Sequence, residues 1–232
     1  SIHQVKMNYN IFPYDHKGNF ITKDIMEHQY PCAWQYLLEH KAKLLPKSLG
    51  GSRDVQPPVS CEDEWYRYGR SQAITSLNNK DKIIVGVNRS KGNPLYLLDQ
   101  DNYLIASGGT AGYVGISLKD GSEYQLEYIH AWLSHPWTDL YLQLIGSDFE
   151  GGFIARGTYT LPMVPFIKID FTDEKQKALY DNVVSGTRKI RQLNEDLMHK
   201  ADKAARNVLE QEKSRLIKNL EGMITKVYQQ KF

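Results

Sequence analysis

The densest group of residues that could do chemistry lies at residues 65–72, which are Trp-Tyr-Arg-Tyr-Gly-Arg-Ser-Gln. Arginine binds phosphate and pairs with guanine through two hydrogen bonds, and glutamine pairs in the same way with adenine. Neighbouring aromatic rings add stacking surfaces. The pattern therefore predicts nucleic-acid recognition, with Arg67, Arg70 and Gln72 as candidate base-reading residues. A second interpretation stays open, namely a β-strand whose aromatic and arginine side chains alternate between two faces.

The charge along the chain supports the first interpretation only locally. The 232 residues have a formal net charge of +2, so the whole chain gives no electrostatic argument for a nucleic-acid partner. Residues 41–92, however, carry ten basic and five acidic groups, whereas residues 93–172 carry three and nine. Within the basic segment, Arg89 and Lys91 are further candidates for base contacts. The candidate phosphate contacts are Lys47, Arg53, Lys80 and Lys82.

The sequence lacks the common catalytic signatures. It has no His-Glu-x-x-His, no Walker A motif and no Gly-x-Ser-x-Gly. The glycine-rich residues 107–112 lack dinucleotide-binding spacing, and Asn-Pro-Leu-Tyr at residues 93–96 lacks a cofactor motif before it, so both predict turns. His130 lies on an apolar helix face and is expected to be a core residue. We therefore expect no catalysis, no metal and no cofactor in this chain.

The compartment is also predictable from composition. No run of 18 apolar residues is present, which excludes a membrane-spanning helix at the level of sequence. Cys32 and Cys61 lack metal-site spacing and predict free thiols in a reducing compartment. The first residues do not resemble a signal peptide and include no initiator methionine, so we expect a cytoplasmic chain that is a segment of a longer protein.

The elements that would position these residues predict an α+β fold. Strands are expected at residues 83–87, 95–98, 103–106 and 113–118, and helices at residues 31–45 and 123–145, the latter interrupted at His135 and Pro136. Trp34, Trp65 and Tyr68 are expected to anchor the core. The mixture favours a mixed or largely antiparallel sheet with flanking helices, forming a domain over residues 1–172.

Residues 173–232 predict a helical tail. Apolar residues recur at steps of three and four, and Thr172 or Asp173 is suited to cap the start. Ser185, Gly186 and Thr187 are expected to break or kink the helix. The pattern permits either one long helix or a helical hairpin. Its apolar stripe must pack against the body, another copy or a further part of the parent protein.

An ordered set of motifs resembles a known family. It comprises residues 30–37 (Tyr-Pro-Cys-Ala-Trp-Gln-Tyr-Leu), 65–72, 82–85 (Lys-Ile-Ile-Val), the glycine-rich loop with Tyr113, 151–153 (Gly-Gly-Phe) and 161–165 (Leu-Pro-Met-Val-Pro). Together they resemble the TaqI-like C-terminal specificity domain over roughly residues 8–170. That domain is the target-recognition domain of Type IIG restriction–modification enzymes and of related adenine-N6 DNA methyltransferases.

The resemblance implies a non-catalytic domain that reads a short target in double-stranded DNA. It implies a separate N-terminal methyltransferase domain that uses S-adenosylmethionine, and in larger members a nuclease domain, for which Mg²⁺ is expected. The resemblance does not name the base-reading residues. The tail resembles the spacer helices of Type I specificity subunits, so a subunit whose tail docks partner subunits is one alternative. Helix-mediated self-association and a protein-interaction module without a DNA role also stay open.

Overall fold

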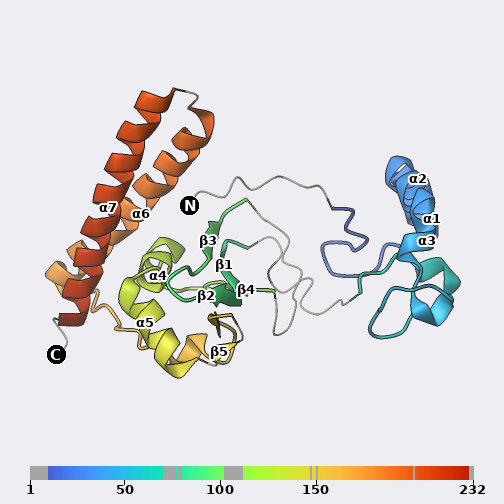
Figure 1. Ribbon diagram of the computed structural model, residues 1–232, viewed down its shortest axis with the longest axis horizontal. Coiled ribbons are helices and arrows are strands. Elements are labelled where there is room, and N and C mark those ends of the chain that lie inside the picture. Colours follow the sequence, from blue (N-terminus) through green and yellow to red (C-terminus); the bar gives the residue numbers. More distant parts are fainter. Residues whose placement is uncertain are drawn as a thin grey trace. The chain divides into compact units, whose positions relative to one another are not determined.

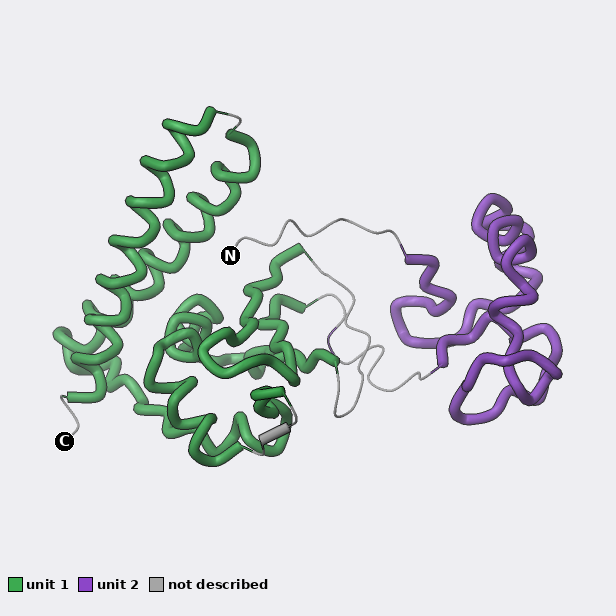
Figure 2. Tube along the Cα trace, viewed as in Figure 1, with its two compact units in different colours: residues 1–4, 79–232 green, residues 5–78 purple. Residues whose placement is uncertain are grey.

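The chain forms two compact units, shown in Figures 1 and 2. The computed structural model describes residues 10–69, 77, 80–101, 112–146, 148–149, 151–200 and 202–229. One unit comprises Val5–Asn78, and the other comprises Ser1–Gln4 with Asn79–Phe232. We call them the N-terminal unit and the C-terminal unit. Short antiparallel sheets and helices together confirm the predicted α+β class.

Helices and aromatic side chains build the N-terminal unit. Its elements are α1 (Lys23–Gln29), α2 (Pro31–Glu39), α3 (Lys41–Leu44) and the 3₁₀ turns η1 (Lys47–Leu49) and η2 (Glu62–Glu64). The helix predicted over residues 31–45 is present but divides at His40. Trp34 and Trp65 are buried in one hydrophobic cluster, which confirms both as core anchors. Residues 65 and 66 form a turn and residues 67–69 form no strand, so the β-strand interpretation is wrong for the described part of this segment.

The first sheet of the C-terminal unit has the strand order β3-β1-β4. Its strands are β1 (Lys82–Gly86), β3 (Tyr96–Asp99) and β4 (Tyr113–Ile116), and β1 pairs antiparallel with both neighbours. These strands confirm three of the predicted runs to within a residue or two. The fourth predicted strand, at residues 103–106, and the glycine-rich residues 107–111 lie outside the described residues. Ile83 and Val85 belong to the main hydrophobic core, which explains why this β-branched run forms the central strand.

A second, smaller sheet has the order β2-β6-β5. It consists of β2 (Asn88–Ser90), β5 (Asp148–Phe149) and β6 (Phe153–Ala155), again antiparallel. Gly151 and Gly152 have φ angles of 82° and 76°, which favour glycine, and they form the turn between β5 and β6. A 3₁₀ turn, η3 (Leu161–Met163), follows β6.

Two short helices pack beside the sheets. α4 (Leu126–Leu133) contributes Leu126, Tyr128 and Leu133 to the core, and α5 (Pro136–Ile145) follows. The predicted interruption between them is confirmed. The His135 side chain accepts a 3.2 Å hydrogen bond from the backbone N–H of Trp137 and so caps α5, while a proline is suited to the first helical turn.

The predicted tail is a helical hairpin, α6 (Glu174–His199) and α7 (Lys203–Gln229), as Figure 1 shows. Asp173 caps α6, because its carboxylate accepts hydrogen bonds of 2.8 and 3.2 Å from the N–H groups of Lys175 and Gln176. The side chain of Gln176 also donates to this carboxylate. That bond, followed by the two backbone bonds, lowers the pKa of Asp173. The apolar stripe packs on the body, since residues of both helices join α4 in the main core.

The expected break at residues 185–187 is wrong, whereas the alternative, a kink, stays a prediction. α6 continues through residues 185–187 without interruption. A Cβ at Gly186 would lie 2.7 Å from Cδ2 of Leu220 in α7, so the glycine allows the two helices to approach closely. Thr187 donates to the carbonyl of Val183 at 2.9 Å, which keeps its hydroxyl satisfied within the helix. The glycine therefore serves helix packing instead of helix termination.

The structure leaves two broader expectations as predictions. Contacts divide the chain between residues 78 and 79, which does not test the functional division at residue 172. Val208 and Ile217 on α7 stay exposed, and self-association through the hairpin likewise stays a prediction.

No helix in the described part of the chain is both long and apolar enough to cross a membrane. Both cysteines are free, as predicted, and both are exposed.

Candidate nucleic-acid interface

Arg53 holds the aromatic segment of the N-terminal unit together from within. Its guanidinium donates to three backbone carbonyls, those of Leu44 at 2.7 Å, Arg67 at 2.6 Å and Trp65 at 2.8 Å. Burial lowers the pKa of Arg53, although an arginine stays charged at neutral pH. Because its Nε and both terminal nitrogens already have protein partners, Arg53 is a structural clamp. These bonds weaken the case for a phosphate contact by Arg53, which stays a prediction.

The guanidinium of Arg67 also interacts with other side chains of the protein. Its guanidinium lies 5.1 Å from the ring centroid of Phe20 and 3.1 Å from a carboxylate oxygen of Glu64. The side chain is about one-third exposed, so it still reaches the surface. Its charge is offset locally by Glu64, and this makes Arg67 a weaker candidate for a DNA contact than the sequence suggests. Arg70 and Gln72 lie outside the described residues.

The tyrosines of this segment use their polar groups for local structure. Tyr66 donates a 2.7 Å hydrogen bond to the carbonyl of Ile21, and burial raises its pKa. The half-buried Tyr68 donates to the carbonyl of Ile11 at 3.0 Å. The aromatic residues of residues 65–68 thus pack the unit and do not present free stacking faces. Among the predicted DNA contacts of this unit that the structure describes, Lys47 on η1 is the exposed one.

Lys82 is a predicted phosphate contact that the fold does not allow. Its ammonium is buried on β1 and lies 2.7 Å from the buried carboxylate of Asp99, its cross-strand partner on β3. A buried ammonium paired in this way cannot reach a phosphate in this fold. Lys80, two residues earlier, is exposed and remains a candidate.

Two further candidates of the C-terminal unit lie at the end of β2 and just after it, because Arg89 belongs to the strand and Lys91 to the turn that follows. We call residues 89–92 the 89–92 turn. Lys91 is exposed, and its backbone N–H donates to the carbonyl of Gly152 at 3.2 Å. Arg89 is partly exposed, and its guanidinium forms no hydrogen bond or ion pair with another described residue. Its stem lies against Gly86, where a Cβ would come within 3.2 Å of Arg89 Cγ and Cδ.

Two residues that sequence analysis did not select hold this turn in place. Arg156 and Asp139 are buried and joined to each other through Nε, at 3.1 Å, and through Nη2. Arg156 also donates to the carbonyl of Arg89, and Asp139 accepts from the N–H of Gly92. The available signal was an isolated arginine after an apolar run in an acidic segment, but the sequence did not identify its partner.

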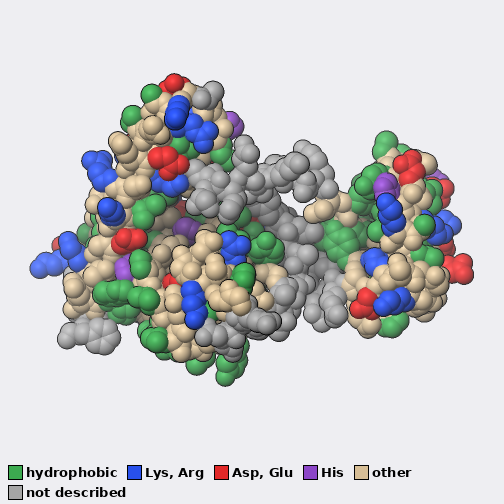
Figure 3. All heavy atoms as spheres, viewed as in Figure 1, with side chains coloured by type: hydrophobic (Ala, Val, Ile, Leu, Met, Phe, Trp, Pro, Cys, Tyr) green, Lys and Arg blue, Asp and Glu red, His purple; other side chains and the backbone are tan. Residues whose placement is uncertain are grey.

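Figure 3 shows that basic and acidic side chains are interspersed on the visible face of both units. The basic segment is also divided, since six of its ten cations belong to the N-terminal unit and four to the C-terminal unit. The excess of basic residues in this part of the sequence is therefore divided between the two units. On each unit, salt dependence of binding would arise from its few exposed cations.

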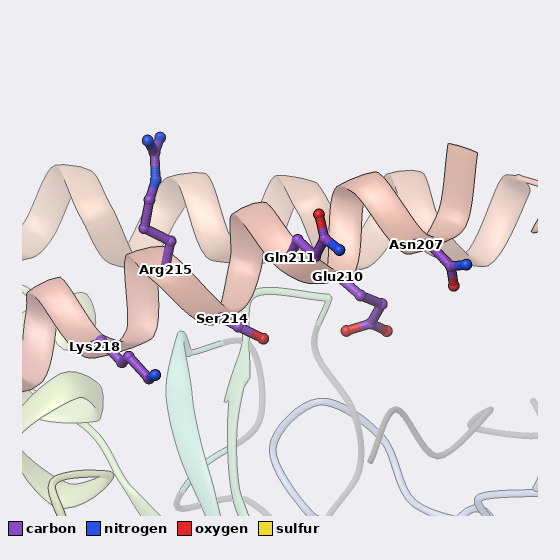
Figure 4. Close-up of a pocket in the computed structure, with 6 residues that line it drawn as sticks. All are labelled: Asn207, Glu210, Gln211, Ser214, Arg215 and Lys218. Carbon is purple, nitrogen blue, oxygen red and sulfur yellow. The ribbon is translucent and has the colours of Figure 1, made fainter. Parts of the chain in front are cut away.

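The described residues offer no enclosed pocket on α7 as an alternative site. The shallow hollow in Figure 4 is lined by one helix face, that of Asn207, Glu210, Gln211, Ser214, Arg215 and Lys218. Arg215 points away from the other side chains. In the described ranges, no group of three or more His, Cys, Asp or Glu side chains could hold a metal ion.

Comparison with known proteins adds the decisive relationship. No family model matches the chain. Over 222 residues it is 34% identical to the Type II restriction enzyme and methyltransferase RM.Eco57I of Escherichia coli. The chain is homologous to a segment of a restriction–modification enzyme. The similar region covers 92% of this chain but only 22% of that relative, so the chain spans about a fifth of the relative's length.

Proposed function

We propose that this chain is the DNA target-recognition part of a bacterial restriction–modification enzyme. The observation that carries the proposal is the similarity to RM.Eco57I over nearly the whole of this chain. The ordered motifs that resemble a TaqI-like specificity domain support the same role at a finer level. On this proposal residues 1–172 recognise double-stranded DNA, and residues 173–232 form a helical tail that completes the C-terminal core.

Recognition would combine two kinds of contact. Exposed lysines, Lys47, Lys80 and Lys91, would position the chain on phosphates, which carry little sequence information. Arg89 would read a base edge, because an arginine fork matches the two acceptors of guanine in the major groove. Each role follows from exposure and from the absence of a competing carboxylate among the described partners of Lys47, Lys80 and Arg89.

Catalysis would belong to other parts of such an enzyme. Methyl transfer from S-adenosylmethionine to adenine requires a methyltransferase domain, and cleavage requires a nuclease domain with Mg²⁺ as the expected metal. The name of the relative includes both a restriction enzyme and a methyltransferase, and that protein is far longer than this chain. The chain itself lacks the common catalytic motifs. The missing methyltransferase domain would be its partner within one polypeptide in the bacterial cytoplasm.

Binding to a random-sequence duplex pool across a salt series tests the proposal. We expect log K to fall linearly with log salt, with a slope of roughly −2 to −4 if a few lysines neutralise phosphates. Selection from the same pool should then enrich one short motif. Folded chain that shows no salt-dependent binding at low ionic strength would contradict the proposal. Methyl transfer by this chain alone from labelled S-adenosylmethionine would contradict its non-catalytic role.

A further inference from the structure

Two buried charges direct three hydrogen bonds to the backbone of residues 89–92, which comprise the end of β2 and the turn after it. Arg156, fully buried, donates to the carbonyl of Arg89 at 2.9 Å and to that of Ser90 at 3.3 Å. The Oδ2 atom of Asp139 accepts from the N–H of Gly92 at 2.9 Å. Three backbone groups within four consecutive residues are thus fixed by one ion pair. The buried pair fixes the backbone of residues 89–92 from the interior of the unit, whereas their side chains reach the surface.

Stability alone is a weak explanation for such a pair. Removing two charges from water is costly, and well-packed apolar residues of similar volume often replace a buried ion pair without loss of stability. What apolar residues could not replace is the set of directional bonds to residues 89, 90 and 92. The same Oδ2 atom of Asp139 also accepts from the Gln143 side chain at 2.9 Å, which helps to fix the orientation of the carboxylate.

The turn that these bonds fix carries Arg89, whose guanidinium has no hydrogen-bond or ion-pair partner among the described residues. Nε of Arg89 is buried without a hydrogen-bond partner among the described residues. Its stem is confined beside Gly86, where any larger residue would come within 3.2 Å. Arg89 is therefore held at its backbone and along its stem, whereas the polar end still needs acceptors. Such an arrangement suits a ligand that supplies fixed acceptor atoms, because little conformational freedom would be lost on binding.

We propose that Arg156 and Asp139 are positioning residues that fix the 89–92 turn so that Arg89 discriminates between DNA sequences. This inference rests on the proposed function. The pair does not touch DNA. It sets the backbone from which Arg89 extends, and misplacement of a base-reading side chain weakens the cognate contact more than non-specific contacts to phosphate.

The test uses the full chain, a random duplex pool and a duplex selected from that pool by the wild-type chain. The double variant Arg156→Met/Asp139→Leu removes both charges at similar volume. We expect its affinity for the selected duplex to fall at least tenfold, towards that for the random pool, while affinity for the random pool changes less than threefold. Amide hydrogen exchange at Gly92 should accelerate. The matched control is Arg188→Met/Glu127→Leu, which removes an ion pair of 2.9 Å between α6 and α4.

A second variant covers the case in which the double variant does not fold. Gly92 has a φ of 70°, and a Cβ there would meet nothing within 4 Å. Gly92→Pro removes the same N–H and forbids this φ while leaving the buried pair intact. Arg156→Lys keeps the charge but cannot form the fork, so it should not restore discrimination.

The outcomes distinguish failure of the positioning role from failure of the proposed DNA recognition. If wild-type chain binds no duplex, the proposed function fails. If wild type discriminates and the folded variants discriminate equally well, even though exchange at Gly92 is faster in the double variant, only the positioning role is overturned. A loss of discrimination in the variants, with the control unchanged, supports the inference.

Discussion

The indole N–H of Trp132 donates a 2.7 Å hydrogen bond to the hydroxyl of Tyr228, which lies 96 positions later in the chain. This bond joins α4 of the body to the last turns of α7. Tyr228 in turn donates to the carbonyl of Pro165 at 3.2 Å. The end of the helical tail is therefore part of the C-terminal unit's core, although its sequence resembles that of an independent helical spacer.

Tyr228→Phe should destabilise the C-terminal unit by about 1–2 kcal/mol, because the N–H of Trp132 and the carbonyl of Pro165 both lose a partner. Urea denaturation followed by tryptophan fluorescence measures the change. Val208→Ser, at an exposed position of the same helix, should alter stability by less than about 0.5 kcal/mol. Equal stability of Tyr228→Phe and wild type would show that the bond contributes nothing.

Removal of residues 173–232 should prevent the C-terminal unit from folding cooperatively. Tyr180, Val183 and Ile224 are buried in the same core as α4, and loss of each such side chain costs about 2–5 kcal/mol. Near-ultraviolet circular dichroism and urea titration of residues 1–172 check this expectation. A native-like spectrum with a sharp transition would instead establish residue 172 as an autonomous domain boundary.

Arg53→Met should destabilise the N-terminal unit by roughly 2–4 kcal/mol, since three backbone carbonyls lose a charged donor. DNA binding of the fraction that stays folded should be unchanged. Lys47→Met should give the opposite result, with unchanged stability and a salt slope smaller in magnitude by about 0.9. Thermal unfolding and anisotropy titrations separate the two effects, and a reduced salt slope in folded Arg53→Met would restore Arg53 as a phosphate contact.

What could be predicted from the sequence were features set by neighbouring residues. Asp173 caps α6 through the N–H groups two and three residues later, and His135 with Pro136 divides α4 from α5, as their local patterns indicated. The central strand β1 was equally clear, because a β-branched run suits a buried strand. In each case the cause and the consequence lie within a few residues of one another.

The errors concern residues whose partners are distant in sequence. Lys82 resembles a surface cation until Asp99 is placed opposite it on β3, and Gly186 resembles a helix breaker until Leu220 packs against it. Arg156 could not be selected as a site residue because Asp139 and the 89–92 turn meet it only in the folded chain. Sequence patterns identified the types of side chain, but folding decided which cations remain available.

Stability of the C-terminal unit should decrease as the pH falls below about 6.5, the ordinary pKa of histidine. Burial lowers the pKa of His130, and this outweighs the hydrogen bond to the carbonyl of Tyr96 and the charge of Glu127. The unfolded chain therefore binds a proton at a pH where the folded chain does not, so acid favours unfolding. Burial lowers the pKa of His135 in the same direction.

Urea midpoints measured at pH 7.5 and at pH 5 should differ less in His130→Gln than in wild type. Glutamine keeps an N–H donor for the Tyr96 carbonyl but does not titrate. His135 remains in both proteins and supplies the residual dependence. An unaltered pH dependence in His130→Gln would show that His130 does not contribute to it.

Arg89→Ala should reduce discrimination between the selected duplex and the random pool by about 1–3 kcal/mol, the range for one bidentate contact to a base. Stability should change little, because the guanidinium forms no hydrogen bond or ion pair with another described residue. Lys168→Ala is the matched control, since it removes one exposed cation from the same unit. If both variants lower affinity for all duplexes equally, Arg89 acts only through its charge. If Arg89→Ala alone loses discrimination while its salt slope stays near that of wild type, the 89–92 turn reads bases, as its rigid support and uncommitted guanidinium predict.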